Sequence, residues 1–231
     1  MEKIIEVKNV VVEYLLGKVT VSALRGINLV IENGDFIAIM GKSGSGKSTL
    51  LQVIGGLQRP TKGKVFINGV DLSKLNENEL AIFRRKNIGF VFQAYNLIPT
   101  LTAIENVELP MVFFNVQQKL RQKKSTKILY KMGLSDRLHH KPNELSGGEQ
   151  QRVGIARSLA NDPEIILADE PTGNLDSKSG ESIMEEFVEV NKNFGKTVVI
   201  VTHAREVALY ANKIIHIKDG LIESIEEVRR N

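Results

Sequence analysis

A glycine-rich segment between a predicted buried strand and a predicted helix constrains the fold of this chain most. Residues 41–48 read GKSGSGKS and match the pattern G-x-x-x-x-G-K-[ST]. The apolar run 35–40 precedes the segment, and the helical pattern 48–54 follows it. Backbone amides of such a loop and the helix N-terminus both favour negative charge. The sequence therefore predicts a phosphate-binding loop in an α/β domain.

The residues of this loop are predicted to bind different parts of a nucleotide. Glycines let the backbone amides crowd around phosphate oxygens, Lys47 adds a full positive charge, and the Ser48 hydroxyl is predicted to ligate Mg²⁺. Thr49 either contacts the α-phosphate or begins the packing of the helix. A flexible glycine-rich turn is the alternative, but the ordered match and its context disfavour it. The predicted nucleotide contacts from this loop are Gly41, Lys42, Ser43, Gly44, Ser45, Gly46, Lys47, Ser48 and Thr49.

Two adjacent carboxylates end the apolar run 165–168. Adjacent residues that leave a strand point in different directions, so Asp169 and Glu170 can take different roles. Asp169 is predicted to hold Mg²⁺ through water, and Glu170 to accept a proton from the attacking water or to orient it. Two solvated acids at a strand end are the alternative interpretation.

The segment 145–151, LSGGEQQ, opens a predicted helix. Ser146 is a plausible N-cap, and the two glycines permit close approach of another group to the backbone. A helix N-terminus with a hydroxyl and free amides suits a γ-phosphate, which makes this a second candidate anion site. Its predicted contacts are Ser146, Gly147, Gly148 and Glu149, and an ordinary capped helix start is the alternative.

The remaining pattern indicates how these motifs are arranged. Buried strands at 88–92, 165–168, 198–201 and 214–217 alternate with helical patterns such as 177–191, which predicts a mostly parallel sheet. Residues 4–31 predict short antiparallel strands with turns at Gly17-Lys18 and at Gly26. Strand signals stop between Gln93 and Leu159, where helical patterns such as 117–132 and 148–159 predict an inserted helical subdomain.

Composition excludes several classes of protein. The net charge of +4 is too small to indicate nucleic acid binding. The absence of cysteine excludes a disulfide framework. The apolar runs are strand-sized, and the first residues lack the apolar core of an export signal, so any membrane role is expected to come through a partner.

In combination, these motifs resemble those of the ABC ATPases. The resemblance covers essentially the whole chain and is strongest to the lipoprotein-release, macrolide-efflux and cell-division group. It is carried by the runs 146–150 (SGGEQ), 88–93 (IGFVFQ), 96–99 (NLIP), 105–110 (ENVELP) and 168–176 (ADEPTGNLD). It implies a P-loop NTPase fold in one domain, 1–231, with the catalytic α/β core from 1–93 and 160–231 and the helical subdomain from about 94–159.

The resemblance also implies roles for residues that physics alone leaves open. It makes Gln93 a link between Mg²⁺, the attacking water and a membrane partner, and His203 the switch that contacts the γ-phosphate. Without it, a lone Gln or His is more often an ordinary surface or core group. Tyr14 is the implied aromatic contact of adenine, although it could simply pack in the β layer. Asp176 is implied to support the site of a second copy.

The implied function is that of an ATP-hydrolysing transporter subunit that requires ATP and Mg²⁺. The phosphate loop and the Ser146 segment are expected to face apart within one chain, so the resemblance implies a head-to-tail homodimer around two ATP molecules. A separate membrane permease is the expected second partner, and residues 93–110, with the exposed-looking Tyr95, Ile98 and Leu101, are its expected contact. The chain is expected on the cytoplasmic face of the membrane, with export or extraction from the membrane as its expected work. A mechanical ATPase that signals through a membrane partner is the alternative.

Other ATPase classes fit the sequence less well. ATPases that act on DNA ends carry a long coiled coil for which this chain has no room, and ribosome-acting ATPases usually carry two cassettes. A P-loop kinase lacks the Ser146 segment. The sequence departs from its group at Lys42, where Pro is common, and at Ala204, where Asp usually follows the histidine.

Overall fold

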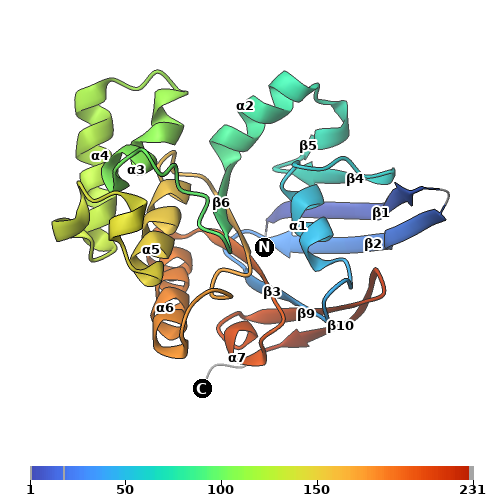
Figure 1. Ribbon diagram of the computed structural model, residues 1–231. Helices are drawn as coiled ribbons and strands as arrows, with labels where there is room; N and C mark the ends of the chain where they lie inside the picture. Colours follow the sequence, from blue (N-terminus) through green and yellow to red (C-terminus); the bar gives the residue numbers. More distant parts are fainter. Residues whose placement is uncertain (1, 18, 229–231) are drawn as a thin grey trace.

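The computed structural model describes residues 2–17 and 19–228, and a six-stranded sheet forms its centre (Figure 1). The strand order is β10-β9-β3-β8-β7-β6; the five strands from β9 to β6 run parallel, and β10 pairs antiparallel with β9. The predicted mostly parallel sheet is confirmed. The strands are β3 (Phe36–Met40), β6 (Ile88–Phe92), β7 (Ile165–Asp169), β8 (Thr197–Thr202), β9 (Lys213–Lys218) and β10 (Leu221–Glu227).

Both faces of this sheet are buried, because alternate residues of each strand enter different cores. In β3, Phe36 and Ala38 join one hydrophobic core, whereas Ile37 and Ile39 join the other. The first core lies against α5, α6 and α7, and the second lies against α1 and the N-terminal β layer. The helices that cover the sheet are α1 (Lys47–Ile54), α6 (Ser177–Phe194) and the short α7 (Arg205–Ala208).

The N-terminal layer is a four-stranded sheet of order β2-β1-β4-β5. Its strands are β1 (Lys3–Leu16), β2 (Val19–Glu32), β4 (Lys62–Ile67) and β5 (Val70–Asp71), and all their pairings are antiparallel. The antiparallel layer is confirmed, but the expected short strands are wrong, since β1 and β2 form one long hairpin. Gly26 does not end a strand: it lies inside β2 with a φ of 96°, where the register shifts between Val10 and Val11. Lys18, in the other predicted turn, lies outside the described residues.

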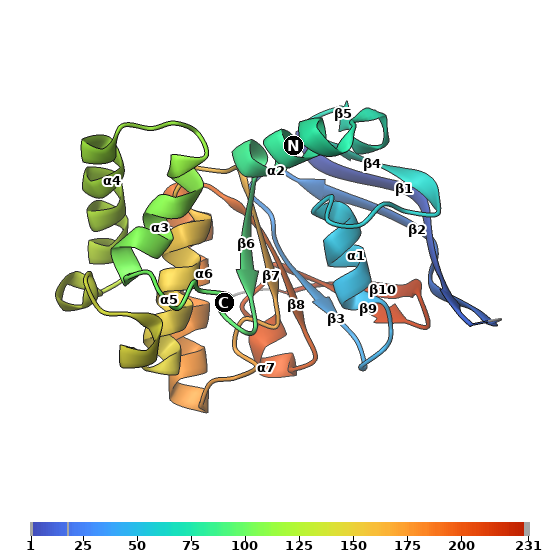
Figure 2. The ribbon, with the colours of Figure 1, turned by 45° about the horizontal axis from the view of Figure 1, so that its top comes forward.

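The helical subdomain is inserted between β6 and β7 (Figure 2). It contains α3 (Ala103–Val112), α4 (Gln118–Lys131) and α5 (Gly147–Ser158), with 3-10 turns at Ser135–Arg137 and Pro142–Glu144. The three helices pack on one another and α5 also packs on α6, so the insertion shares the hydrophobic core that includes β3 residues Phe36 and Ala38. The inserted helical subdomain agrees with the sequence prediction.

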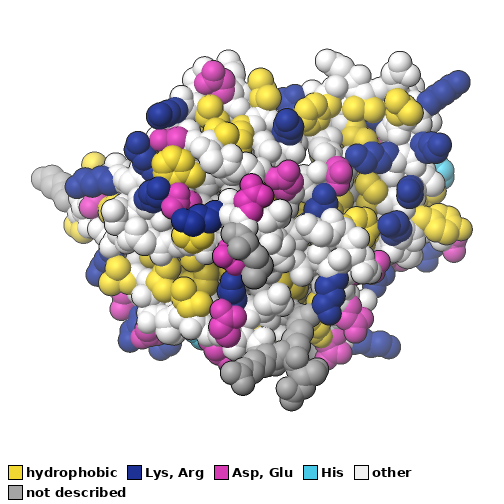
Figure 3. Space-filling model, turned by 180° about the vertical axis from the view of Figure 1, so that it is seen from behind, with side chains coloured by type: hydrophobic (Ala, Val, Ile, Leu, Met, Phe, Trp, Pro, Cys, Tyr) yellow, Lys and Arg dark blue, Asp and Glu magenta, His cyan; other side chains and the backbone are white. Residues whose placement is uncertain are grey.

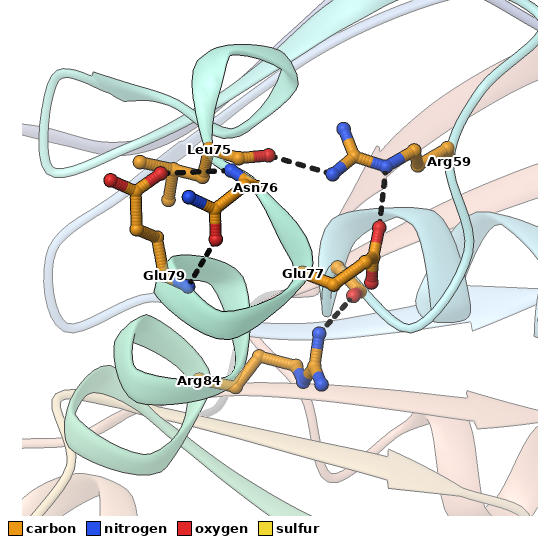
Figure 4. A network of polar contacts seen from close by, with 7 residues as sticks. Arg59, Leu75, Asn76, Glu77, Glu79 and Arg84 are labelled. Atoms are coloured by element: carbon orange, nitrogen blue, oxygen red, sulfur yellow. Dashed lines mark hydrogen bonds and ion pairs between the residues drawn. The ribbon is translucent and has the colours of Figure 1, made fainter.

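One helix that the sequence analysis did not identify precedes β6. Helix α2 (Glu77–Asn87) follows a 3-10 turn at Leu72–Lys74 and begins with a capping box, in which the side chains of Asn76 and Glu79 each accept from the other's backbone amide. Figure 4 shows this box beside the ion pair between Arg59 and Glu77. Arg84 also donates to the Gly56 carbonyl, so α2 is tied to the loop that follows α1.

The surface mixes charges of both signs. On the face shown in Figure 3, Lys and Arg side chains alternate with Asp and Glu side chains among small groups of hydrophobic side chains. Charged side chains of one sign do not gather into a single patch on the face in view. Within the described ranges, the helices are too short or too polar to cross a membrane.

Candidate functional site

The predicted phosphate loop runs from the end of β3 to the start of α1. Gly46 is the N-cap residue of α1 and has a φ of 103°, a region that favours glycine. Lys47 is buried, and its ammonium group donates to the Lys42 carbonyl at 2.9 Å, across the loop. The loop therefore holds a positive charge and a helix N-terminus at the carboxyl end of a central strand, where open α/β sheets bind ligands.

Substituting Gly46 by alanine is expected to distort this loop. A Cβ atom at Gly46 would lie 2.5 Å from the Ala23 carbonyl oxygen, and its φ disfavours any L side chain. We expect Gly46→Ala to destabilise the fold by about 1–3 kcal/mol and to weaken nucleotide binding strongly. Urea denaturation and fluorescent-nucleotide titration would check this. The matched control is Gly34→Ala, which also has a positive φ but meets open space; equal nucleotide affinity in both variants would contradict the expectation.

The structure brings the two predicted Mg²⁺ groups together. The Ser48 hydroxyl donates to Asp169 Oδ1 at 3.0 Å, although the two residues are 121 positions apart in the chain. Burial raises the pKa of Asp169, and the neighbouring charge of Glu170 raises it further, against the Ser48 hydrogen bond and the Lys47 charge. A cation at this point would favour the ionised carboxylate.

Glu170 and His203 also meet. His203 Nδ1 lies 3.1 Å from Glu170 Oε1, and these residues follow the neighbouring strands β7 and β8. Glu170 has a φ of 44°, which is uncommon for a residue with a side chain and is often found at functional sites. Its amide donates to the Val201 carbonyl, which fixes this backbone to β8. Glu170 can therefore act as a proton acceptor, with the titratable side chain of His203 beside it.

Gln93 follows β6, whose residue Phe92 pairs with Asp169 of β7. Its side-chain amide donates to Asn174 Oδ1 at 3.3 Å, and the Asn174 amide donates back to the Gln93 carbonyl at 3.0 Å. Gln93 is therefore linked to the turn that follows Glu170. That turn continues to Asp176, which caps α6 by accepting from the Ser179 amide and hydroxyl.

The Ser146 segment begins α5 with a capping box. The Glu149 amide donates to Ser146 Oγ at 3.3 Å, and the Ser146 amide donates to Glu149 Oε2 at 2.8 Å. The Ser146 amide, its hydroxyl and the Arg137 guanidinium hold the pKa of Glu149 below its usual range. Ser146 is exposed, so this helix start can meet a ligand or another chain.

The Ser146 segment and the phosphate loop lie apart within the chain. Gly147 is next to Tyr95 and Leu175, and Gly148 is next to Ser179, whereas the phosphate loop is next to Ala23 and Ile217. Figures 1 and 2 both show α5 and α1 on opposite sides of the central strands. The structure therefore forms one cluster from the phosphate loop, Asp169, Glu170 and His203, and leaves the Ser146 segment outside it.

Tyr14 lies on β1 in the antiparallel layer. Its hydroxyl donates to Gln58 Oε1 at 2.8 Å, and 37% of the residue is exposed, so its ring has a free surface. Two further residues join the segments around the site: Gln151, to which the sequence analysis gave no role, and Tyr95, which it placed only in the permease contact. Tyr95 contacts Gly147, and the buried Gln151 donates to the Pro171 carbonyl at 2.7 Å. The hydrophobic pattern of the sequence could not reveal either contact, because each one joins segments that are far apart in the chain.

The sequence of this chain is similar to those of known proteins. The family model described as "ABC transporter" matches residues 24–173. An uncharacterized ABC transporter ATP-binding protein of Thermotoga maritima is 54% identical over 226 residues, which are 98% of this chain and 96% of that protein. A macrolide export ATP-binding/permease protein MacB of Shewanella sp. is 51% identical over 91% of this chain and 32% of its own length.

A solved structure extends the similarity to three dimensions. The dimeric structure of a post-hydrolysis state of the ATP-binding cassette MJ0796, bound to ADP and Pi, has a TM-score of 0.91 and 49% sequence identity. The similarity covers 98% of this chain and 100% of that chain. The fold therefore matches that of an ATP-binding cassette over nearly the whole chain.

Proposed function

This chain belongs to the ABC transporter family of ATP-binding proteins, and from that premise we propose that it hydrolyses ATP as a dimer to drive a separate membrane permease. ATP binding and hydrolysis follow from the family and from the ADP-bound similar structure. The identity of the partner and the roles of single residues belong to the proposal.

We infer the following division of roles within the site. Lys47 and the loop amides neutralise the phosphates, and Ser48 and Asp169 offer the hard oxygen ligands that Mg²⁺ prefers. The contact between Ser48 and Asp169 brings these two oxygen ligands together and fits a cation there. Mg²⁺, when bound, would offset phosphate charge in the transition state. Gln93 is the third proposed Mg²⁺ ligand, and Tyr14 is the proposed adenine contact.

Glu170 is the proposed acceptor for the proton of the attacking water. Its side chain is 23% exposed and lies 3.1 Å from His203, which would contact the γ-phosphate. A carboxylate orients water and accepts a proton more effectively when a second group fixes its position, and His203 is placed to do so. The pair would thus detect the γ-phosphate and support its hydrolysis together.

The separation of the Ser146 segment from the phosphate loop is the observation that carries the dimer. A γ-phosphate held by Lys47 can be met by a Ser146 hydroxyl only if that hydroxyl comes from a second copy. Two copies arranged head to tail would complete two sites, as closed twofold symmetry requires. The dimeric state of the similar cassette supports this arrangement. Binding of ATP would then close the dimer, and loss of the γ-phosphate would open it.

The segment between β6 and α3 is the proposed contact for the permease. Ile98 is exposed, whereas Tyr95 and Leu101, which the sequence pattern suggested to be exposed, are only partly so. Buried Asn106 holds the segment rigid: it accepts from the Ile98 amide and donates to the Ile98, Leu101 and Thr102 carbonyls. Gln93 precedes this segment, so the contact would be coupled to the site.

Charge at Ile98 is expected to disrupt membrane binding without reducing ATP hydrolysis. Ile98→Asp would place a carboxylate in the proposed apolar contact, where desolvating it is costly. Binding to inside-out membrane vesicles of the source organism should fall at least about tenfold, and the basal ATPase rate should stay within about twofold. Leu221→Asp, at an exposed apolar position on β10, is the control. Unchanged vesicle binding by the Ile98 variant would exclude this contact.

The proposed location follows from the same partner. A chain that binds ATP and a permease would sit on the cytoplasmic face of the membrane, where ATP is available. The similarity to a macrolide export protein favours export or extraction from the membrane over uptake.

A further inference from the structure

The short helix α7 begins directly after His203 and lacks the usual means of stabilising its start. It has four residues, Arg205–Ala208, and its N-cap residue is Ala204, whose side chain offers no acceptor. A Ser, Thr, Asp or Asn at this position would accept from a free amide of the first turn. A single helical turn is not stable by itself in water, so α7 must be held from outside.

Val207 and Ala208 pack into the hydrophobic core, and an ion pair to another segment holds the exposed first residue of the helix. Arg205, the first residue of α7, donates from both terminal nitrogens to Glu226 of β10, at 2.7 and 2.6 Å. This two-point geometry is the strongest form of the Arg–carboxylate pair. The Arg205 and His216 hydrogen bonds lower the pKa of Glu226 to about 2, so the carboxylate is charged at neutral pH.

The same carboxylate is joined to the strand beside the phosphate loop. His216 Nε2 lies 3.2 Å from Glu226 Oε2, and His216 pairs with Met40, the residue that precedes Gly41. The cluster of Arg205, Glu226 and His216 therefore connects the start of α7 to the strand pair that carries the phosphate loop. His203 is two residues from Arg205, so this cluster lies next in the chain to the proposed γ-phosphate contact.

We propose that the Arg205–Glu226 ion pair positions His203 by anchoring α7, in the place of the N-cap that Ala204 does not provide. The inference rests on the proposed role of His203 at the γ-phosphate. Arg205 and Glu226 touch neither nucleotide nor water in this account and act only through His203. Exposed ion pairs usually stabilise a fold little, whereas two-point geometry restricts how the two joined segments lie. Loss of the pair is therefore expected to change catalysis more than the stability of the fold.

The test compares Glu226→Gln, which keeps the shape and loses the charge, with the double variant Ala204→Asp/Glu226→Gln. The single change should lower kcat roughly tenfold with KM for ATP within about twofold, because a displaced His203 affects the reacting phosphate more than ground-state binding. The added Asp should restore at least half of the lost activity by capping α7. Arg205→Lys, which keeps the charge without the planar fork, should fall between wild type and Glu226→Gln.

Two controls separate this inference from its premises. Glu77→Gln removes an exposed Arg–Glu pair with a single hydrogen bond (Figure 4), on α2, and should leave kcat unchanged. His203→Ala should abolish hydrolysis; if it does not, the proposed role of His203 fails and this inference with it. If His203→Ala is inactive but Glu226→Gln keeps wild-type kcat, or if Ala204→Asp restores nothing, the positioning role alone is overturned.

Discussion

Glu170→Gln is expected to reduce ATP hydrolysis at least about 100-fold while ATP binding persists, because the amide cannot accept the proton of the attacking water. The substitution keeps the size of the side chain and can still contact His203, which lies 3.1 Å from Glu170 in the structure. ATP would therefore bind, close the dimer and remain unhydrolysed. Size-exclusion chromatography with ATP and Mg²⁺ should show a stable dimer of the variant, which should separate into monomers with ADP.

The control for this variant is Glu164→Gln, an exposed carboxylate just before the same strand β7. It should hydrolyse ATP at the wild-type rate and form no lasting dimer. A wild-type rate for Glu170→Gln would show that another group accepts the proton. A monomer at all ATP concentrations would argue against the shared site.

Mixing two inactive variants is expected to restore hydrolysis if each site is built from two chains. Lys47→Ala removes the phosphate-loop charge, and Ser146→Arg blocks the start of α5; each alone should lose about 100-fold or more in rate. In a mixed dimer, one site receives both changes, and the other receives the intact phosphate loop of one chain and the intact Ser146 segment of its partner. An equal mixture should recover roughly a quarter of the wild-type rate, since half of the dimers are mixed and each has one working site.

The mixing experiment requires a control in which restoration is impossible. Lys47→Ala mixed with a Lys47→Ala/Ser146→Arg double variant has no intact phosphate loop in any dimer and should stay inactive. Restoration in the first mixture and not in the second is possible only for sites shared between chains. If the first mixture stays inactive although both variants fold and dimerise, each chain carries a complete site, and the head-to-tail arrangement is wrong.

Local sequence determined the elements that carry the site. The strand before the phosphate loop, the loop itself and α1 follow from a buried apolar run, ordered glycines and a helical pattern within about twenty residues. The same holds for β7 with Asp169 and Glu170, and for α5 with its capping box at Ser146. These predictions succeeded because the interactions that form each element lie within the segment.

Predictions failed where neighbours distant in the sequence decide the outcome. Gly26 was expected to end a strand, but β1 provides a partner on both sides of it, so the positive φ becomes an irregularity inside one long strand. Tyr95 was expected to be exposed, yet it is only partly so, and it contacts Gly147, which belongs to α5. Helix α2 was not identified because its few apolar residues produce a weak pattern, while its capping box and Arg84 contact supply the stability.

The sequence by itself determined that this protein binds phosphate, where its strands and helices carry the candidate groups, and to which family it belongs. Only the tertiary structure decided that Ser48 meets Asp169, that Glu170 meets His203, and that Arg205 is held by Glu226. It also decided that the Ser146 segment lies outside this cluster. The physical reason is that hydrophobic periodicity and helix capping depend on interactions within one helix or strand. These contacts instead depend on how parallel strands bring their carboxyl ends together.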